Sequence, residues 1–213
     1  MSEISAAAHP PEAANLHDVI AWRLADAGWC VVEDFLDVAT VAALRNEALG
    51  HWQDGCYHLA RVGRGDAAMH QPAIRRDQVM WFEPPFSECQ ARYLDRMEAL
   101  RTVINEKAYL GLLDFECHFT RYALGAFYAR HLDRFRDDSR RTVSVVVYLN
   151  ETWTENDGGA LRLYFSDGTD ANYLDIEPRG GTLVCFLSDR FWHEVRPTAR
   201  ERISLSGWFR TRR

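Results

Sequence analysis

The sequence predicts an α+β protein, mainly β, with a double-stranded β-helix (jelly roll) core buttressed by N-terminal helices. In the first half of the chain, apolar residues recur at three- and four-residue steps, which is typical of helices. From Glu116 onward they alternate with other residues, which is typical of strands. Turn signals such as Asp157-Gly158-Gly159 and Asp167-Gly168 separate these strands. Helices followed by many short strands fit a jelly roll with helical support.

The helical pattern begins at Leu16, where Val19, Ile20 and Leu24 share one face and Gly28 ends the helix. An aspartate, Asp37, can cap the second helix. The expected helices run over residues 16–27, from Asp37 to about Leu49, and from Ser87 to about Leu110. The expected strands cover residues 29–32, 116–123, 127–133, 142–149, 159–165, 172–177, 182–187, 191–196 and 202–210.

Domain organisation follows from length and local composition. Residues 1–15 are small, polar and interrupted by proline, which predicts a disordered lead-in. The remaining residues, 16–213, suffice for one sizeable core. We therefore expect a single domain over 16–213, with its jelly-roll core at about 116–210.

Charge and hydropathy exclude several classes of function. The net charge is −6, and no basic block precedes the short tail Arg210–Arg213, so nucleic-acid binding is not expected. No stretch of 18 apolar residues predicts a membrane span. The five cysteines are scattered and odd in number, which favours reduced thiols over a disulfide framework. These features predict a cytoplasmic protein with no membrane partner.

One short motif predicts a metal site. On an extended strand, residues two apart share one face. His131-Leu132-Asp133 would therefore present an imidazole and a carboxylate side by side, and His193 can supply a third ligand. Two histidines and one carboxylate on one side of an ion are typical of non-haem Fe(II) oxygenases. A salt-bridged pair on a strand is the alternative for the motif taken alone.

Two later strands extend this interpretation. In 142–149, one face carries only aliphatic side chains, whereas the other includes Ser144 and Tyr148 and suits the wall of a polar pocket. In 202–210, small serines follow Arg202 on the same face and leave room for a ligand beside its guanidinium. An arginine with a nearby tyrosine hydroxyl can hold one carboxylate through a bidentate contact and a hydrogen bond. A solvated charge near the C-terminus is the alternative for Arg202, but its position nine residues after His193, on a face of small polar side chains, favours the pocket.

A long polar loop precedes the strands. Arg61–Pro72 has little apolar content and two glycines, and loops of this length are often lids. His58 and His70, in or near this loop, are candidates for substrate contact. His118, on the strand before the motif, is interpreted as a packed or hydrogen-bonded histidine.

Over most of residues 57–210 the chain resembles the Fe(II)- and 2-oxoglutarate-dependent oxygenases, and among them the hypoxia-inducible-factor prolyl hydroxylases and their bacterial relatives. The segments that carry the resemblance are IRRDQVMWFE (74–83), RYALGAFYARHLD (121–133), VYLNETW (147–153), GGALRLY (158–164), DIEPRGGTLVCFLSDR (175–190), HEVRPT (193–198) and RISLSGWF (202–209). The loop before His131 is one residue shorter than in the animal enzymes, and the segment after Asp133 has its own sequence. Both abut the substrate entrance.

The resemblance implies a role for each matching residue. The metal ligands would be His131, Asp133 and His193. Arg202 and Tyr148 would bind 2-oxoglutarate, with Tyr122 lining the metal pocket and Ser144 supporting the site. The implied substrate contacts are Tyr128 and Trp208 as walls, and Arg75 and Asp77 at the base of the lid.

The implied cofactors are Fe(II), 2-oxoglutarate and O₂, with ascorbate as reductant. The implied activity is 4-hydroxylation of a prolyl residue in a protein or peptide, with elongation factor Tu as a family-implied target. Two alternatives stay open: a 2-oxoglutarate oxygenase acting on a free amino acid or other small molecule, and a non-catalytic metal- or oxoglutarate-binding sensor.

Overall fold

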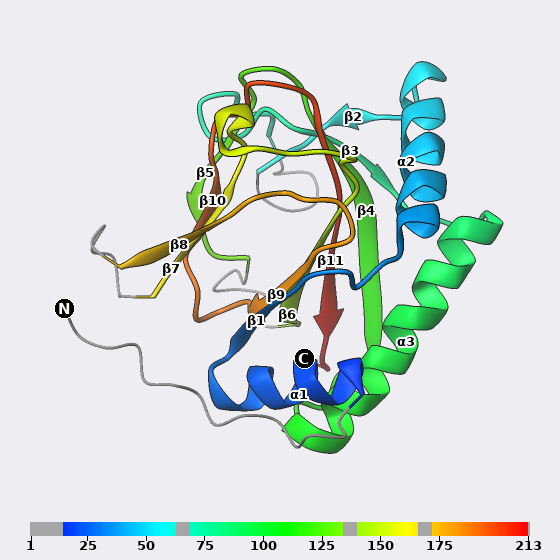
Figure 1. Cartoon of the computed structure of the whole chain (residues 1–213), viewed down its shortest axis with the longest axis vertical. Coiled ribbons are helices and arrows are strands. Elements are labelled where there is room, and N and C mark those ends of the chain that lie inside the picture. Colours follow the sequence, from blue (N-terminus) through cyan, green and yellow to red (C-terminus); the bar gives the residue numbers. More distant parts are fainter. Residues whose placement is uncertain (1–14, 63–68, 134–139, 166–171, 213) are drawn as a thin grey trace.

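Two antiparallel sheets face each other in the computed structural model, which describes residues 15–62, 69–133, 140–165 and 172–212 (Figure 1). The larger sheet has seven strands in the order β1 (Trp29–Val32), β9 (Leu183–Leu187), β6 (Arg141–Tyr148), β11 (Arg202–Arg210), β4 (Asp114–Tyr122), β3 (Gln78–Trp81) and β2 (His58–Leu59). The smaller sheet has four, in the order β5 (Tyr128–His131), β10 (His193–Val195), β7 (Leu161–Tyr164) and β8 (Tyr173–Ile176). The expected jelly roll with helical support is confirmed.

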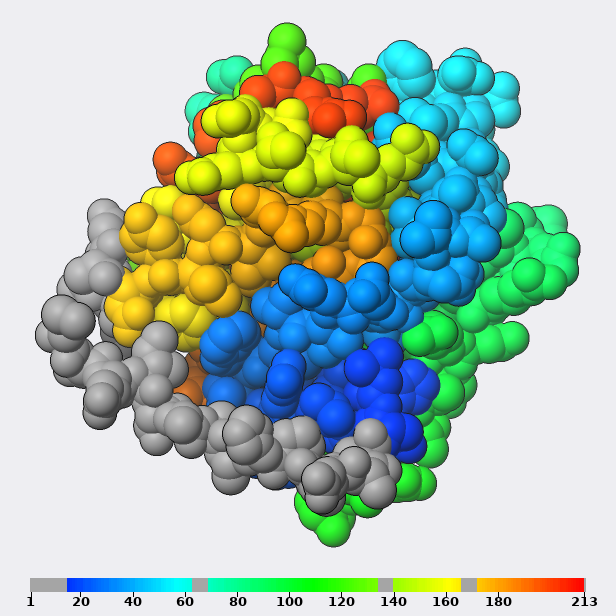
Figure 2. Space-filling view, viewed as in Figure 1, coloured from blue at the N-terminus to red at the C-terminus, as the bar shows by residue number. Residues whose placement is uncertain are grey.

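Three helices cover the outer face of the larger sheet: α1 (Leu16–Asp26), α2 (Val38–Gln53) and α3 (Glu88–Ala108). In each case the residue before the helix caps it. The side chains of Asn15, Asp37 and Ser87 accept hydrogen bonds from backbone N–H groups three residues ahead. Figure 2 shows α1–α3 in blue to green on one side of the molecule and β8 on the other. Because helices occupy the outer face, the inner face of the sheet is left for the site.

Strand β6 shows how the sequence divides the two faces. Val143, Val145 and Val147 are buried against the helices, as the alternation predicted. Tyr148 and Val146 belong to the second apolar cluster, which lies between the two sheets. One face of β6 therefore stabilises the helical layer and the other lines the interior of the jelly roll.

Two details differ from the prediction. Strand β5 ends at His131, so the expected strand 127–133 is too long and Asp133 follows the strand rather than sharing its face. Strands β2 and β3 were not expected, because two and four residues give too short a pattern. They form by pairing, β2 with β3 and β3 with β4, where Trp81 lies opposite His118.

Parts of the expected lead-in and lid, residues 1–14 and 63–68, lie outside the described residues. The ends of the lid loop are joined, since Val62 and Met69 exchange two backbone hydrogen bonds of 2.9 Å. Within the described residues, no helix is long and apolar enough to cross a membrane. All five cysteines are free, as expected; Cys30, Cys117 and Cys185 are buried and Cys56 is exposed.

Candidate active site

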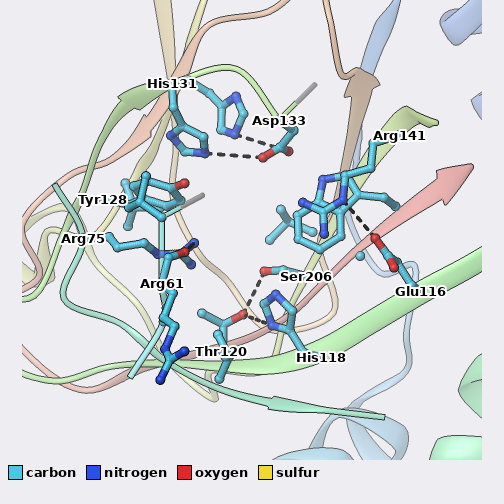
Figure 3. A pocket seen from close by; sticks show the side chains of 18 of the residues that line it. Arg61, Arg75, Glu116, His118, Thr120, Tyr128, His131, Asp133, Arg141 and Ser206 are labelled. Atoms are coloured by element: carbon cyan, nitrogen blue, oxygen red, sulfur yellow. Dashed lines mark hydrogen bonds and ion pairs between the residues drawn. The ribbon is translucent and has the colours of Figure 1, made fainter. Parts of the chain in front are cut away.

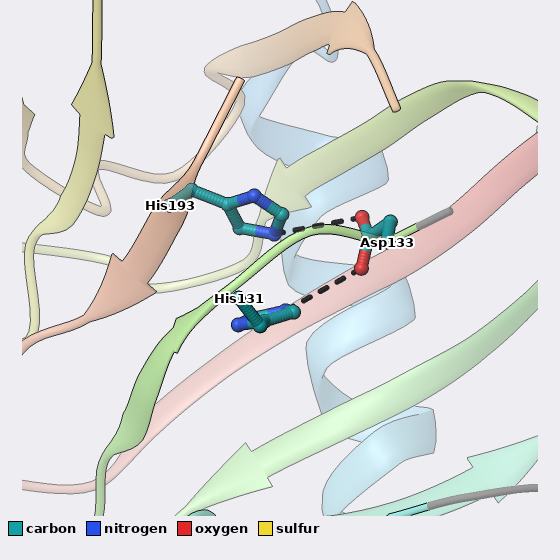
Figure 4. A group of neighbouring side chains, drawn as sticks. All are labelled: His131, Asp133 and His193. Carbon is teal, nitrogen blue, oxygen red and sulfur yellow. Dashed lines mark ion pairs between the residues drawn. The ribbon is translucent and has the colours of Figure 1, made fainter. Parts of the chain in front are cut away.

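A histidine–aspartate–histidine group lies between the sheets (Figure 4). His131 and His193 are direct cross-strand partners on β5 and β10. The Asp133 carboxylate lies 3.4 Å from His131 Nε2 through Oδ1 and 3.5 Å from His193 Nε2 through Oδ2. One ligand atom from each residue lies within 4.8 Å of the others. The structure thus brings together the three predicted ligands in an arrangement that can hold a metal ion.

Backbone carbonyls orient both imidazoles. Nδ1 of His131 lies 2.9 Å from the carbonyl oxygen of Ala129, and Nδ1 of His193 lies 3.1 Å from that of Phe191. A carbonyl oxygen can only accept, so each Nδ1 carries the proton and each Nε2 keeps its lone pair. Such a partner on the distal nitrogen is the usual companion of a metal-binding histidine.

The carboxylate is also held in place. Ser144 Oγ donates to Asp133 Oδ2 at 2.6 Å and lies 2.8 Å from Ser188 Oγ. Burial alone would raise the pKa of Asp133, but its contacts with the His193 and His131 side chains hold it well below its usual value. Asp133 therefore offers its oxygens ionised. Ser188 was not anticipated, since only the pairing of β6 with β9 brings it near Ser144.

We predict that Ser144→Ala lowers Fe(II) affinity about tenfold, because outer partners of metal ligands are typically worth 10- to 100-fold in affinity. Equilibrium dialysis with metal analysis measures this. Ser188→Ala is the matched control, since it leaves the contact between Ser144 and Asp133 in place and should have the smaller effect. Equal affinities for Ser144→Ala and the unmodified protein would show that the hydroxyl does not support the ligand.

The group opens on a cavity of about 830 Å³ between the sheets (Figure 3). Its lining includes most of the predicted site residues: His131, Asp133, His193, Arg202, Tyr122, Tyr128, Trp208 and Arg75. His58 and His70 also line it, consistent with their position near the lid. Tyr148 and Ser144 are fully buried beside this lining, and Asp77 is buried behind Arg75.

Arg202 is a buried cation, only 1% exposed, and no described carboxylate pairs with it. Its Nε donates to the Gly159 carbonyl at 3.0 Å and Nη1 donates to Ser204 Oγ at 3.2 Å. The guanidinium lies 4.9 Å from the Tyr122 ring and 5.1 Å from the Tyr148 ring. A buried charge normally requires an ionic partner. Arg202 is therefore not the solvated charge that was the alternative from sequence.

The Tyr148 side chain lies beside the Arg202 guanidinium. Its hydroxyl is fully buried and has no hydrogen-bond partner among the described residues, although a buried hydroxyl normally has one. Burial raises its pKa to about 12, so it is a donor at neutral pH. An unpaired cation beside an unpaired hydroxyl fits the carboxylate of a bound ligand such as 2-oxoglutarate.

Gly159, which was read only as part of a turn, contributes through its backbone. Its φ of +67° lies in the left-handed region, and a Cβ there would lie 3.2 Å from Arg202 Cδ. Glycine thus lets the chain approach Arg202 closely enough for the carbonyl to accept its Nε–H. The Gly-Gly turn signal located this position but gave no indication of its partner.

Tyr128 links the metal group to the lid. Its ring stacks on His131 with centroids 3.6 Å apart, and the Arg75 guanidinium lies 4.1 Å from its centroid on the ring face. Arg75 forms two hydrogen bonds with the buried carboxylate of Asp77, at 2.8 and 2.5 Å. A third contact, from Arg75 Nη1 to the Arg61 carbonyl at 3.5 Å, reaches the start of the lid loop. Three of the four predicted substrate contacts, Tyr128, Arg75 and Asp77, therefore form one connected chain.

Five further polar or charged side chains, which sequence reasoning did not assign to the site, also face the cavity along β4 and β11. They are Glu116, His118, Thr120, Ser206 and Arg210. These residues alternate along the two strands with the core residues, so a period-two pattern could have found them. Their polar character suits a binding surface better than a packed core.

A jelly roll that encloses two histidines and a carboxylate, with a buried arginine in the same cavity, defines a class of protein, the non-haem iron oxygenases. Comparison with known sequences agrees, since residues 117–210 match the 2OG-Fe(II) oxygenase superfamily. The solved structure of a Pseudomonas putida prolyl-4-hydroxylase is 44% identical, has a TM-score of 0.82, and is matched over 93% of this chain and 100% of its own. The chain belongs to the 2OG-Fe(II) oxygenase superfamily.

Two further relatives are less similar in sequence. A prolyl hydroxylase from Trichoplax adhaerens, solved with a hypoxia-inducible-factor oxygen-degradation-domain peptide, is 26% identical with a TM-score of 0.81, over 92% of this chain and 89% of that one. Human Egl nine homolog 1 is 28% identical over 194 residues, which cover 85% of this chain. The chain spans less than half of that human protein, 43% of its length.

Proposed function

We propose that this protein is an Fe(II)- and 2-oxoglutarate-dependent dioxygenase that 4-hydroxylates a prolyl residue in a protein or peptide. The 44% identity to a prolyl-4-hydroxylase supports the reaction, and the peptide complex of the Trichoplax relative supports the kind of substrate. Elongation factor Tu, the target implied by the sequence resemblance, is the first candidate protein to test.

The length of the cavity wall is the observation that supports a peptide substrate. Beyond Arg202, which faces the proposed 2-oxoglutarate site, strand β11 contributes lining residues from Ser206 to Arg210. At about 3.4 Å per residue, this part of the wall is roughly 14 Å long. A free amino acid occupies a small part of such a wall, whereas an extended peptide can follow it. The cavity therefore supports a peptide substrate over a free amino acid.

In this proposal His131, Asp133 and His193 hold Fe(II), and Ser144 fixes the carboxylate. When bound, Fe(II) with 2-oxoglutarate and O₂ supplies the oxidant for a C–H bond, while the protein provides positioning and excludes water. Arg202 binds the distal carboxylate of 2-oxoglutarate through its free N–H groups, and Tyr148 donates a hydrogen bond to the same carboxylate. Tyr122 closes the pocket beside them. Ascorbate is the proposed reductant.

The target proline lies between Tyr128 and Trp208 in this proposal. Both side chains line the cavity. Because His131 and Arg75 cover the two faces of the Tyr128 ring, Tyr128 would present its edge and hydroxyl to the pyrrolidine ring, and Trp208 would supply an apolar surface. The ion pair between Arg75 and Asp77 holds the start of the lid loop against Tyr128. Closure of the loop over a peptide would then exclude water from the C–H bond that reacts.

We expect a proline-containing protein or peptide to gain one oxygen atom on a prolyl ring, dependent on Fe(II) and 2-oxoglutarate. Mass spectrometry of intact elongation factor Tu and of peptides with randomised flanks measures this. Free proline should react far more slowly, because it cannot contact the length of the β11 wall. Equal turnover of free proline would replace the proposal with the small-molecule alternative, and absence of succinate with every substrate would favour the sensor.

A further inference from the structure

His118 lies in the cavity but takes no part in the site described above. It is on β4, opposite Ser206 of β11 and Trp81 of β3. Its ring centroid is 4.7 Å from that of Trp81 and 5.6 Å from that of Trp208. All four side chains line the cavity. Figure 3 shows His118 below Ser206 and beside Thr120, on the side of the cavity away from His131 and Asp133.

Its neighbours fix the tautomer of His118. Nδ1 lies 3.2 Å from the Phe119 carbonyl oxygen and 3.0 Å from Thr120 Oγ1. Thr120 uses its own proton on Ser206 Oγ at 3.0 Å. Both partners of Nδ1 thus act as acceptors, so Nδ1 carries the proton, and Nε2, which has no hydrogen-bond partner among the described residues, can accept one. Burial, with a smaller contribution from Arg75, lowers the pKa of His118 to about 3, so the ring is neutral at physiological pH.

The neighbouring indole of Trp208 offers an unpaired donor, whereas His118 offers an acceptor. Trp208 is 9% exposed, and its Nε1–H has no hydrogen-bond partner among the described residues. Its ring is held by Arg141, whose guanidinium lies 3.5 Å from its centroid and is itself fixed by a 2.9 Å hydrogen bond to Glu116. A buried polar group without a partner costs about 1–3 kcal/mol. The cavity thus contains an unpaired donor and an unpaired acceptor on adjacent rings.

A peptide residue with an extended backbone carries the two groups that such a donor and acceptor would bind. In an antiparallel ladder, a residue presents its N–H and its C=O to the same neighbour. Proline has no backbone N–H, so the target residue cannot make both bonds. The matching residue is therefore a neighbour of the target.

We propose that His118 Nε2 and Trp208 Nε1 bind the backbone N–H and C=O of one non-proline residue that flanks the target proline. This inference rests on the proposed prolyl hydroxylase function and specifies its substrate: an extended peptide with an intact amide at one fixed distance from the proline. It makes His118 a specificity-determining residue that acts on backbone rather than on side chains.

The test uses a decapeptide with one central proline, selected from a randomised-flank library as the best substrate of the unmodified protein. Each flanking amide in turn is replaced by an ester, which removes one N–H without adding bulk. Peptide affinity is measured by calorimetry with Fe(II) and 2-oxoglutarate under nitrogen. One ester should weaken binding to the unmodified protein about tenfold, the effect of roughly one hydrogen bond.

Three protein variants test which side chain binds the N–H of that residue and which binds its C=O. In His118→Met, which removes the acceptor, the same ester should cause no further loss. In His118→Gln, which retains an acceptor, the ester penalty should remain. Trp208→Phe, which removes the donor along with part of the ring, should weaken binding of the parent peptide and keep the ester penalty. A thioamide at the carbonyl of the same residue, a weaker acceptor, should then weaken binding to the unmodified protein but not to Trp208→Phe.

An ester penalty of equal size in the unmodified protein and in His118→Met would overturn the inference. So would an unmodified protein that hydroxylates the peptide and shows no ester-sensitive position, and in both cases the proposed function would stand. If no prolyl peptide or protein gained oxygen, the proposed function and the inference would both be wrong.

Discussion

Replacing either His131 or His193 with alanine should lower Fe(II) affinity more than a hundredfold and abolish turnover. Losing an outer partner of a ligand already costs 10- to 100-fold, and losing the ligand itself should cost more. The remaining imidazole and the Asp133 carboxylate would leave too few donors to hold the ion at useful affinity. Fe(II) affinity is measured by equilibrium dialysis under nitrogen, and turnover by succinate formation.

The control for this pair is His51→Ala. His51 lies on α2, outside the cavity lining, and its described ionic contact is with Glu47 at 3.5 Å. Its removal should leave Fe(II) affinity unchanged. Circular dichroism should show all three variants folded, because the packed sheets do not depend on the ion. Unaltered Fe(II) affinity in His131→Ala or His193→Ala would remove that residue from the ligand set.

Arg202→Lys should raise the dissociation constant for 2-oxoglutarate about ten- to a hundredfold, with Fe(II) affinity unchanged. Lysine keeps the charge but loses the planar guanidinium that matches a carboxylate. It also loses the Nε–H that is fixed on the Gly159 carbonyl. A hydrogen bond to a charged group is worth about 1.5–3 kcal/mol, which corresponds to this range. Calorimetric titration of the Fe(II)-loaded protein under nitrogen measures it.

The matched control is Arg200→Lys. Arg200 is exposed, lies two residues before Arg202, and pairs with Asp157 at 3.7 Å outside the cavity. This substitution should leave 2-oxoglutarate affinity unaltered. If Arg202→Lys behaved in the same way, Arg202 would not be the carboxylate-binding residue, and the unpaired Tyr148 hydroxyl would need a different ligand.

The local sequence pattern was enough to predict the three helices, the bounds of one long strand and part of the site. Capping side chains and apolar spacing placed three helices, and the period-two pattern gave β11 its bounds, Arg202–Arg210, as expected. The same alternation put Ser144 and Tyr148 on the inner face of β6, because side chains of an extended strand must alternate. The motif at His131 and the residue types at Asp133 and His193 indicated a metal site without any tertiary information.

Pairing between distant strands decided the rest. The motif does not present His131 and Asp133 on one strand face, since β5 ends at His131. The Asp133 carboxylate lies near both histidines, and a hydrogen bond from Ser144 fixes it there. Ser188 and Gly159 entered the site only through the register of β6 with β9 and the approach of a loop to Arg202. Local periodicity fixes which face a side chain takes, but not which strand lies opposite. That choice depends on packing the two sheets together, and it placed His193 opposite His131.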